Sequence, residues 1–281
     1  MVRIILLQGE IKLDSIELAW RIRRDAIEMT HLSHASHIGS ALSCADILAV
    51  LYTDVLRYNV QDDHWEERDR LVLSKGHAGS ALYAALAEVG FFPVEELKTY
   101  YQNGSRLSGH ISHKGVPGVE FSTGSLGHGV CVATGLAMAG KLDRKQYRTY
   151  AIVGDGECDE GSLWETVLFA NHFCLKDYTI IVDHNGLQSI GRCEDTIALL
   201  DLGKKFQSFG WNVIEVDGHN HIQLKEAFLK RFPNEKPVCI IANTVKGKGV
   251  SFMENKVLWH YRDPQGEFYE QAVKELEDSR P

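Results

Sequence analysis

Apolar residues recur at helical spacing through the first hundred residues of the chain. Ile16, Ala19, Ile22 and Ala26 fall three or four positions apart, which places them on one face of a helix. A short apolar strand at residues 70–74 interrupts this pattern, so the part from about 14 to 102 is expected to be mainly helical. Helices with this spacing are predicted over residues 14–35, 43–56, 79–89 and 95–101.

From residue 127 onward the pattern changes to short apolar strands that alternate with helices. Runs such as Ala151-Ile152-Val153 are continuously apolar, which is typical of a parallel sheet covered on both faces. We predict an α/β fold with a parallel sheet flanked by helices on both faces, in which ligands bind beyond the carboxyl ends of the strands. The predicted strands are 149–153, 178–183, 212–216 and 238–243, and the predicted helices are 127–142, 160–173, 202–209, 222–231 and 267–278.

The stretch between these two parts, residues 103–125, follows neither pattern and is rich in glycine. Irregular loops of this length are uncommon in compact domains unless they are functional. The chain has no Pro-rich or Ser-rich linker, no charge block and no repeat, and its 281 residues can form one core. We therefore expect a single domain over residues 1–281.

Composition and charge exclude several classes of function. The net charge is −8, so the chain lacks the basic surface that nucleic acid or an anionic membrane requires. The six cysteines form no C-x-x-C pair, and we interpret them as small buried residues in a reducing compartment. The sequence shows neither a signal peptide nor an apolar run of bilayer length. We expect a cytoplasmic protein without nucleic-acid or membrane partners.

The turn Gly154-Asp155-Gly156 lies between a predicted strand and a predicted helix. A dinucleotide-binding fold would have G-x-G-x-x-G here, so that backbone N–H groups contact a bare pyrophosphate. Asp159 stands in place of the third glycine, and the Asp155 carboxylate would repel such an anion. A divalent cation between Asp155 and a diphosphate removes this repulsion, and Mg²⁺ is commonly held by one or two protein groups together with phosphates.

A second polar turn follows the next strand, at Asn185, Gly186 and Leu187. Because neighbouring parallel strands end side by side, the Asn185 side chain and a backbone carbonyl of this turn can reach the same cation. Either turn alone is most simply an ordinary tight turn. Together, at two consecutive strand ends, they favour a metal-bridged diphosphate.

The stretch GDGECDEGSLWETVLFANHFCLKDYTIIVDHNGLQSIG, residues 154–191, resembles the thiamine diphosphate motif, a Gly-Asp-Gly followed by a more distant Asn. The chain is similar to transketolases from about His31 to His260. The resemblance implies thiamine diphosphate with Mg²⁺, or else Ca²⁺ or Mn²⁺, in a fold of the type that holds the diphosphate. It implies that Gly156 contacts the diphosphate and that Glu160 helps to order an acidic network between subunits. The implied metal ligands are Asp155, Asn185 and the carbonyl of Leu187.

The resemblance continues around several histidines. Segments 36–39, 73–78 and 108–110 are similar to transketolase segments, and they imply that His37, His77 and His110 act as donors and proton shuttles around the substrate. His77 is expected at a helix N-terminus, where its positive charge would suit the diphosphate. Ile38, His128 and Tyr261 depart from common family residues, so substrate detail is not carried over. Segments 118–127 and 246–260 imply further cofactor contacts from Gly124, Leu126 and His260.

The family also implies what the chain does not contain. Transketolases carry a pyrimidine-binding domain, with a glutamate that activates the cofactor, and a third C-terminal domain. No sequence pattern for either is present before residue 281. The chain therefore resembles the N-terminal subunit of a split transketolase, active with a C-terminal subunit in a heterotetramer of two plus two. The implied reaction transfers a two-carbon ketol unit from a ketose or its phosphate to an aldose or its phosphate.

Three alternatives stay open at the level of sequence. A deoxyxylulose-phosphate-synthase-like subunit is one, because residues 36–40 also suit that family. An NAD-dependent dehydrogenase is a second, although Asp155 and Asp159 argue against it. A non-catalytic homologue is the third.

Overall fold

The computed structural model describes residues 13–281, and it contains one five-stranded sheet with the strand order β1-β2-β3-β5-β4. Every neighbouring pair of strands is parallel, which confirms the predicted fold class. The five apolar runs predicted as strands all form, each within about one residue of its expected end. The strands are β1 Arg70–Leu73, β2 Thr149–Gly154, β3 Tyr178–His184, β4 Asn212–Asp217 and β5 Val238–Asn243.

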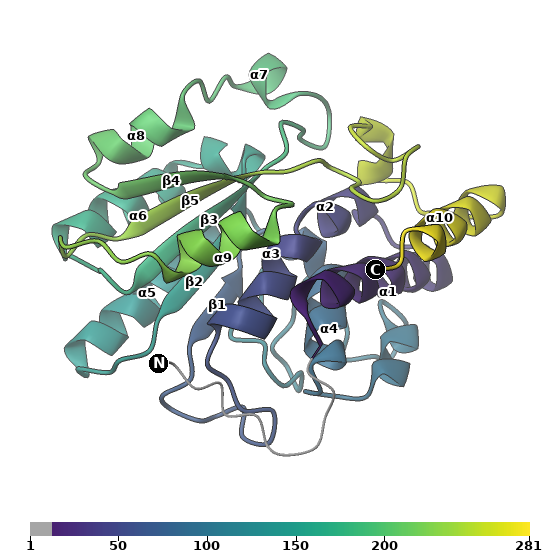
Figure 1. The fold of residues 1–281 in the computed structure, drawn as a ribbon, viewed down its shortest axis with the longest axis horizontal. Helices are drawn as coiled ribbons and strands as arrows, with labels where there is room; N and C mark the ends of the chain where they lie inside the picture. The colour runs from purple at the N-terminus through teal and green to yellow at the C-terminus, as the bar shows by residue number, and fades with distance from the viewer. Residues whose placement is uncertain (1–12) are drawn as a thin grey trace.

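Successive side chains along each strand enter two different hydrophobic cores, one on each face of the sheet. On β2, for example, Ala151 packs in one core and Ile152 in the other. Helices from the C-terminal part cover the first face, whereas N-terminal helices and α9 (His221–Leu229) cover the second (Figure 1). The first-face helices are α5 His128–Leu142, α6 Gly161–His172 and α8 Leu202–Ser208.

The N-terminal part packs its helices against one another around α1, Ser15–Ser33. The Asp14 side chain begins this helix by accepting a hydrogen bond from the Glu17 N–H, at 2.8 Å. The helix ends at His34, which has a positive φ of 55°. The other helices of this part are α2 Ile38–Ser43, α3 Ala45–Val50 and α4 Gly79–Glu88.

Two predicted helices differ from the structure. The expected helix 43–56 is broken at Cys44 and ends in a π-helical turn, Leu51–Val55, because a helical repeat of apolar residues does not reveal such breaks. The expected helix 95–101 is a 3₁₀ helix, Val94–Thr99. The sequence pattern also missed four short elements: α2, apart from its last residue, η4 Gly156–Asp159, α7 Cys193–Thr196 and η5 Val257–His260.

The chain ends in α10, Glu267–Asp278, which has the predicted bounds and packs against α1. No helix within residues 13–281 is long and apolar enough to span a bilayer.

Candidate functional site

A cavity of about 240 Å³ lies at the carboxyl edge of the sheet, beyond the ends of β2 and β3. The register sets Gly154 beside Asp183, so the turns that follow these two strands are neighbours. Of the predicted site residues, Glu160 alone is absent from the cavity wall. The ten that line it are His37, His77, His110, Gly124, Leu126, Asp155, Gly156, Asn185, Leu187 and His260.

Asp155 is a buried carboxylate, 2% exposed, at the start of the turn that follows β2. One of its oxygens accepts the Gly156 N–H at 2.8 Å and the other accepts the Gly186 N–H. Burial raises its pKa, although these bonds to the charged form oppose the rise. In the described part of the chain, no lysine or arginine forms an ion pair with Asp155.

The second turn presents two more oxygens. The Asn185 side-chain oxygen accepts the Leu187 N–H at 3.1 Å, and the Leu187 carbonyl accepts the Lys246 ammonium at 3.0 Å. Gly186, between them, has a φ of +74°, a conformation that favours glycine. A carboxylate, an amide oxygen and a carbonyl oxygen therefore line one cavity, and these are the ligand types that Mg²⁺ prefers.

Four histidines, which we call the histidine cluster, form one wall: His37, His77, His110 and His260. The His37 ring lies 5.3 Å from His77, 5.5 Å from His110 and 4.9 Å from His260, measured between ring centroids. The His37 N–H also donates to the His260 carbonyl at 2.6 Å, which joins the start of α2 to η5. Residues far apart in the sequence are thus held against one another.

Burial keeps three members of the histidine cluster, His37, His77 and His260, neutral. It lowers the pKa of His37 to about 4, assisted by His110, and the pKa of His260 to about 3, assisted by the positive charge of Lys246. The pKa of His77 is also well below its ordinary value, chiefly because the ring is buried and lies near Lys75. The His77 ring is therefore neutral here, and the positive charge expected on it beside a diphosphate stays a prediction. Its short 3₁₀ turn, Gly76–Ala78, precedes α4.

Two lysines in the cavity were missed as site residues by the sequence analysis. Lys75, 1% exposed, forms an ion pair with Asp183, which is fully buried at the end of β3. Ser43 and Thr244 donate to the same carboxylate, so its charge is well compensated. Asp183 at the end of an apolar strand was the available signal, since a carboxylate there needs a partner.

Lys246, 2% exposed, is the second lysine. Its ammonium donates to the carbonyls of Leu187 at 3.0 Å and Gln188 at 3.1 Å, and it contacts His260 Nδ1 at 3.0 Å. Burial lowers the pKa of Lys246 to about 8, and the nearby charge of Lys75 acts in the same direction. An anionic ligand beside Lys246 would stabilise the charged form of this ammonium.

Glu157 was also missed, and it ties the turn after β2 to the irregular loop. Its buried carboxylate accepts hydrogen bonds from the Ser74 hydroxyl, the Gly127 N–H at 2.9 Å and the Gly154 N–H at 3.2 Å. Gly127 has a φ of +76° and lies against the Glu160 side chain. Glu160 itself is exposed at the start of α6, away from the cavity, and its role between subunits stays a prediction.

Comparison with known proteins shows which family this chain belongs to. The sequence pattern of the family described as "Transketolase, thiamine diphosphate binding domain" matches residues 15–266. One of the subunits of the apulose-4-phosphate transketolase of Phocaeicola vulgatus is 40% identical over 257 residues, which are 91% of this chain and 91% of that protein. The 6-deoxy-6-sulfo-D-fructose transketolase subunit SqwG of Clostridium sp. is also 40% identical, over 91% of this chain and 94% of that protein.

Full-length transketolases match as well, over only part of their length. Human transketolase is 38% identical over 92% of this chain but 41% of its own length. The crystal structure of transketolase from Campylobacter jejuni has a TM-score of 0.87 and 28% identity, over 95% of this chain and 43% of that one. This chain thus spans less than half of these proteins. It belongs to the transketolase family and corresponds to the family's thiamine diphosphate-binding domain.

Proposed function

We propose that this chain, as a single thiamine diphosphate-binding domain, is the N-terminal subunit of a transketolase that transfers a two-carbon ketol unit from a ketose or its phosphate to an aldose or its phosphate. The observation that carries the proposal is the convergence of three candidate metal oxygens, two buried lysines and four histidines on one cavity. The family match supplies the cofactor class.

The donor set fits a divalent cation held by Asp155, Asn185 and the Leu187 carbonyl. Asp155 is buried without a cationic partner among residues 13–281, and a buried unpaired carboxylate is costly unless a cation compensates it. Oxygen ligands of these three types suit Mg²⁺, and also Ca²⁺ or Mn²⁺. A cation bound by the Leu187 carbonyl would compete with the Lys246 ammonium, which would then be available for an anion.

The remaining lining residues suit the two ends of thiamine diphosphate. Gly156, His77 and His260, with Lys246, lie beside the candidate metal ligands and would contact the diphosphate. Gly124 and Leu126, on the irregular loop, would contact the organic rings. The bound cofactor supplies the carbon nucleophile that breaks the carbon–carbon bond of the ketose.

His37, His77 and His110 would handle protons during this reaction. A neutral imidazole can donate a hydrogen bond from one nitrogen and accept a proton at the other, as general acid–base catalysis requires. The lowered pKa values of His37 and His77 keep both rings neutral at pH 7. The rings would therefore serve as donors to developing alkoxides and as shuttles for the substrate hydroxyl protons.

A second subunit would complete the enzyme in a two-plus-two heterotetramer. None of the arginines within residues 13–281 lines the cavity, so groups for a sugar phosphate would come from elsewhere. Two relatives of matching length are named as subunits of transketolases. A C-terminal subunit with the pyrimidine-binding domain would supply the activating glutamate, and Glu160 would face it. The six cysteines are free thiols, which suits the cytoplasm.

The proposal is tested by measuring ketol transfer from xylulose 5-phosphate, apulose 4-phosphate and 6-deoxy-6-sulfo-D-fructose to aldose phosphates. We expect no transfer with the chain alone, transfer once a subunit with a pyrimidine-binding domain is added, and loss of transfer after treatment with EDTA that Mg²⁺ restores. Turnover by the lone chain would rule out the split arrangement. Full activity in a metal-free preparation would rule out the metal site.

A further inference from the structure

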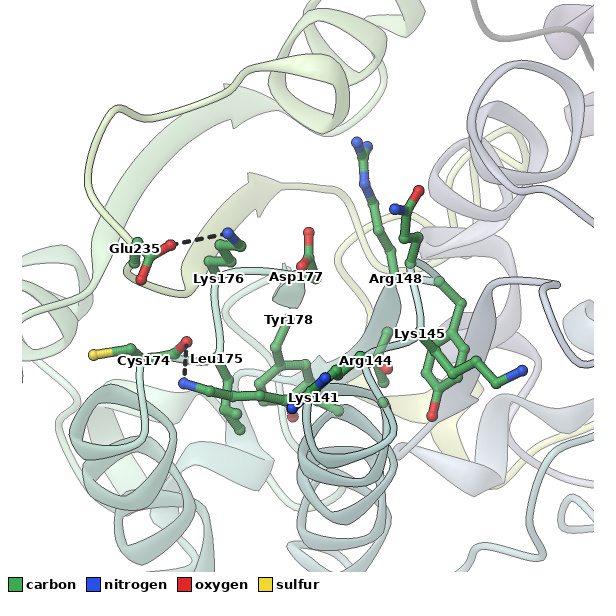
Figure 2. Close-up of a pocket in the computed structure, with 15 residues that line it drawn as sticks. Lys141, Arg144, Lys145, Arg148, Cys174, Leu175, Lys176, Asp177, Tyr178 and Glu235 are labelled. Carbon is green, nitrogen blue, oxygen red and sulfur yellow. Dashed lines mark hydrogen bonds and ion pairs between the residues drawn. The ribbon is translucent and has the colours of Figure 1, made fainter.

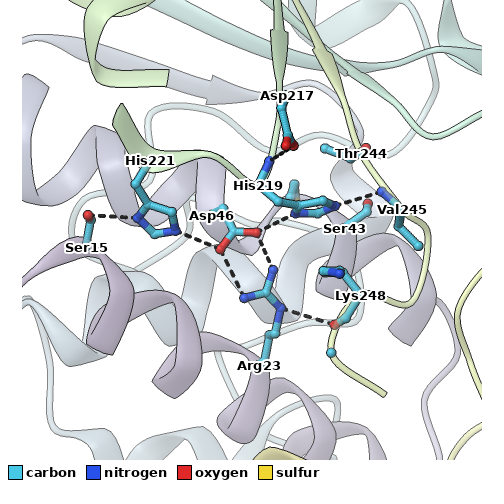
Figure 3. A network of polar contacts seen from close by, with 12 residues as sticks. Ser15, Arg23, Ser43, Asp46, Asp217, His219, His221, Thr244, Val245 and Lys248 are labelled. Atoms are coloured by element: carbon cyan, nitrogen blue, oxygen red, sulfur yellow. Dashed lines mark hydrogen bonds and ion pairs between the residues drawn. The ribbon is translucent and has the colours of Figure 1, made fainter. Parts of the chain in front are cut away.

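Behind the wall of the cavity, three side chains meet at Asp46 on α3, a carboxylate that is 4% exposed (Figure 3). Both oxygens accept hydrogen bonds from the Arg23 guanidinium of α1. One oxygen also accepts His219 Nδ1–H at 2.6 Å, and the other accepts His221 Nε2–H at 3.0 Å. Burial opposes the charge on Asp46, but Arg23 and both imidazoles outweigh it and hold the pKa well below its ordinary value, so the carboxylate can only accept.

The hydrogen bonds fix the tautomer of His219. Its Nδ1 must carry a proton to donate to Asp46, whereas its Nε2 lies 2.8 Å from the backbone N–H of Val245 and must accept. His219 is therefore the neutral Nδ1–H form. His221 differs, because its second nitrogen faces the Ser15 hydroxyl at 2.8 Å, a group that can donate or accept.

The partners of this cluster identify what it holds. His219 binds the N–H of Val245, and the Arg23 Nε donates to the carbonyl of Lys248 at 3.1 Å. Lys246 lies between these two anchors, with its ammonium inside the cavity. The loop has further anchors, which include the Gly247 N–H to the Gly39 carbonyl at 2.9 Å and the Asn255 N–H to the Lys246 carbonyl at 2.9 Å. The backbone on both sides of Lys246 is thus fixed from outside the cavity.

We propose that Asp46 and His219 are positioning residues that act through the backbone of residues 245–248 to aim the Lys246 ammonium into the cofactor cavity. Neither Asp46 nor His219 lines that cavity. The charged carboxylate orients the imidazole, the imidazole fixes the Val245 amide, and the amide sets the place where the lysine side chain begins. A residue that orients a ligand-binding group from behind commonly changes ligand affinity ~10-fold to ~100-fold when it is removed.

A purely structural role for the cluster makes a different prediction, and His221 provides the matched control. Both histidines donate to the same carboxylate, and both have side chains that are 15% exposed. His219 alone of the two binds the loop that carries Lys246. A structural role would make His219→Ala and His221→Ala equivalent, whereas the positioning role confines the loss at Lys246 to His219→Ala.

The first test measures how well residues 245–248 are protected in the full chain, without cofactor. Hydrogen exchange at the Val245 amide and the acetylation rate of Lys246 with acetic anhydride are followed by mass spectrometry. We expect both rates to rise ~10-fold or more in His219→Ala and to stay near wild type in His221→Ala. His219→Gln, whose amide can donate and accept across a similar span, should restore slow rates. Equal rates in His219→Ala and wild type, or equal increases in both alanine variants, would overturn the proposal.

The second test reads the consequence for the ligand, and it rests on the proposed function. Thiamine diphosphate with Mg²⁺ is titrated into wild type, His219→Ala and His221→Ala, each assembled with the second subunit. We expect ~10-fold weaker binding for His219→Ala alone. If wild type binds no cofactor, the proposed function fails. The hydrogen-exchange result then still tests whether His219 positions the backbone of residues 245–248. If wild type and His219→Ala bind equally, the positioning role is overturned although the proposed function stands.

Discussion

The two edges of the sheet carry pockets of opposite character. The cavity at the carboxyl edge measures about 240 Å³, and its lysines, Lys75 and Lys246, are buried and hydrogen-bonded. The pocket at the amino edge is larger, about 530 Å³, and lies where β2 and β3 begin, beside the ends of α5 and α6 (Figure 2). Its cations are Lys141, Arg144, Lys145, Arg148 and Lys176.

The difference lies in how the charges are held. Lys176 pairs with Glu235 at the amino edge, but these side chains are 55% and 69% exposed, so water screens both partners. The Lys75–Asp183 pair at the carboxyl edge is almost fully removed from water. Such burial costs free energy unless each charge is compensated. The larger of these two pockets is therefore not the candidate site, and the smaller one differs from it in having lysines that are buried and hydrogen-bonded.

The largest expected contrast is in stability. Replacing Lys75 with Met leaves the Asp183 carboxylate buried without its counter-ion, and we expect a loss of about 3–5 kcal/mol in the free energy of unfolding. Lys176→Met removes an exposed ion pair and should leave stability unchanged. Urea unfolding of both variants measures the difference. Similar losses in the two would contradict the contrast between the edges.

The next contrast concerns cofactor affinity. Asp155→Ala removes the carboxylate of the candidate metal site, and we expect thiamine diphosphate to bind more than ~100-fold more weakly in the presence of Mg²⁺. Asp177→Ala changes a carboxylate of the amino-edge pocket and should leave binding unaltered. Calorimetric titration of the assembled enzyme is the measurement. Retained affinity in Asp155→Ala would remove the metal from the proposal.

A pH effect on stability should come from His37 and His260. Unfolding returns His37 and His260 from pKa values of about 4 and about 3 to the ordinary value of about 6.5. Below pH 6.5 the unfolded chain therefore binds more protons than the folded one, and stability falls as the pH falls towards 4. In His260→Asn, the loss of unfolding free energy between pH 7 and pH 5 should be smaller than in wild type by about 1–2 kcal/mol. His172→Gln, at an exposed position on α6, should keep the wild-type slope.

The smallest expected effect is on the pH dependence of cofactor binding. Lys246 has a pKa of about 8 and binds an anion only when it is protonated. The affinity for the cofactor should therefore be highest well below pH 8 and decline as the pH rises through 8. We expect a decrease of about fourfold between pH 7 and 8.5. In Lys246→Arg the cation persists over this range, so the decline should disappear. An unchanged decline in that variant would assign the effect to another group.

The fold was largely predictable from the sequence because each strand is a continuous apolar run between polar turns. The break between α2 and α3 at Cys44 was not, since the apolar spacing continues across it. The turns at Asp155 and Asn185 were found because each lies directly after a strand, where parallel topology brings ligands together.

Residues whose roles depend on distant partners were harder to find. Lys75 and Asp183 are separated by 108 positions, so the position of Asp183 signals that it needs a partner but does not identify Lys75 as that partner. The same holds for His219 and Asp46, which are 173 positions apart. Sequence spacing reports what one helix or one strand end brings together, whereas these contacts arise only when elements distant in the sequence pack together.

Among residues 13–281 no arginine lines the cavity, which has a consequence for how substrate preference can evolve. If the site holds the cofactor and moves protons but does not bind the far end of a sugar, it imposes little selection among sugars. Under the proposed function, the second subunit would determine which sugar is used. Exchanging that subunit for one adapted to another sugar would redirect the enzyme while this chain stays as it is.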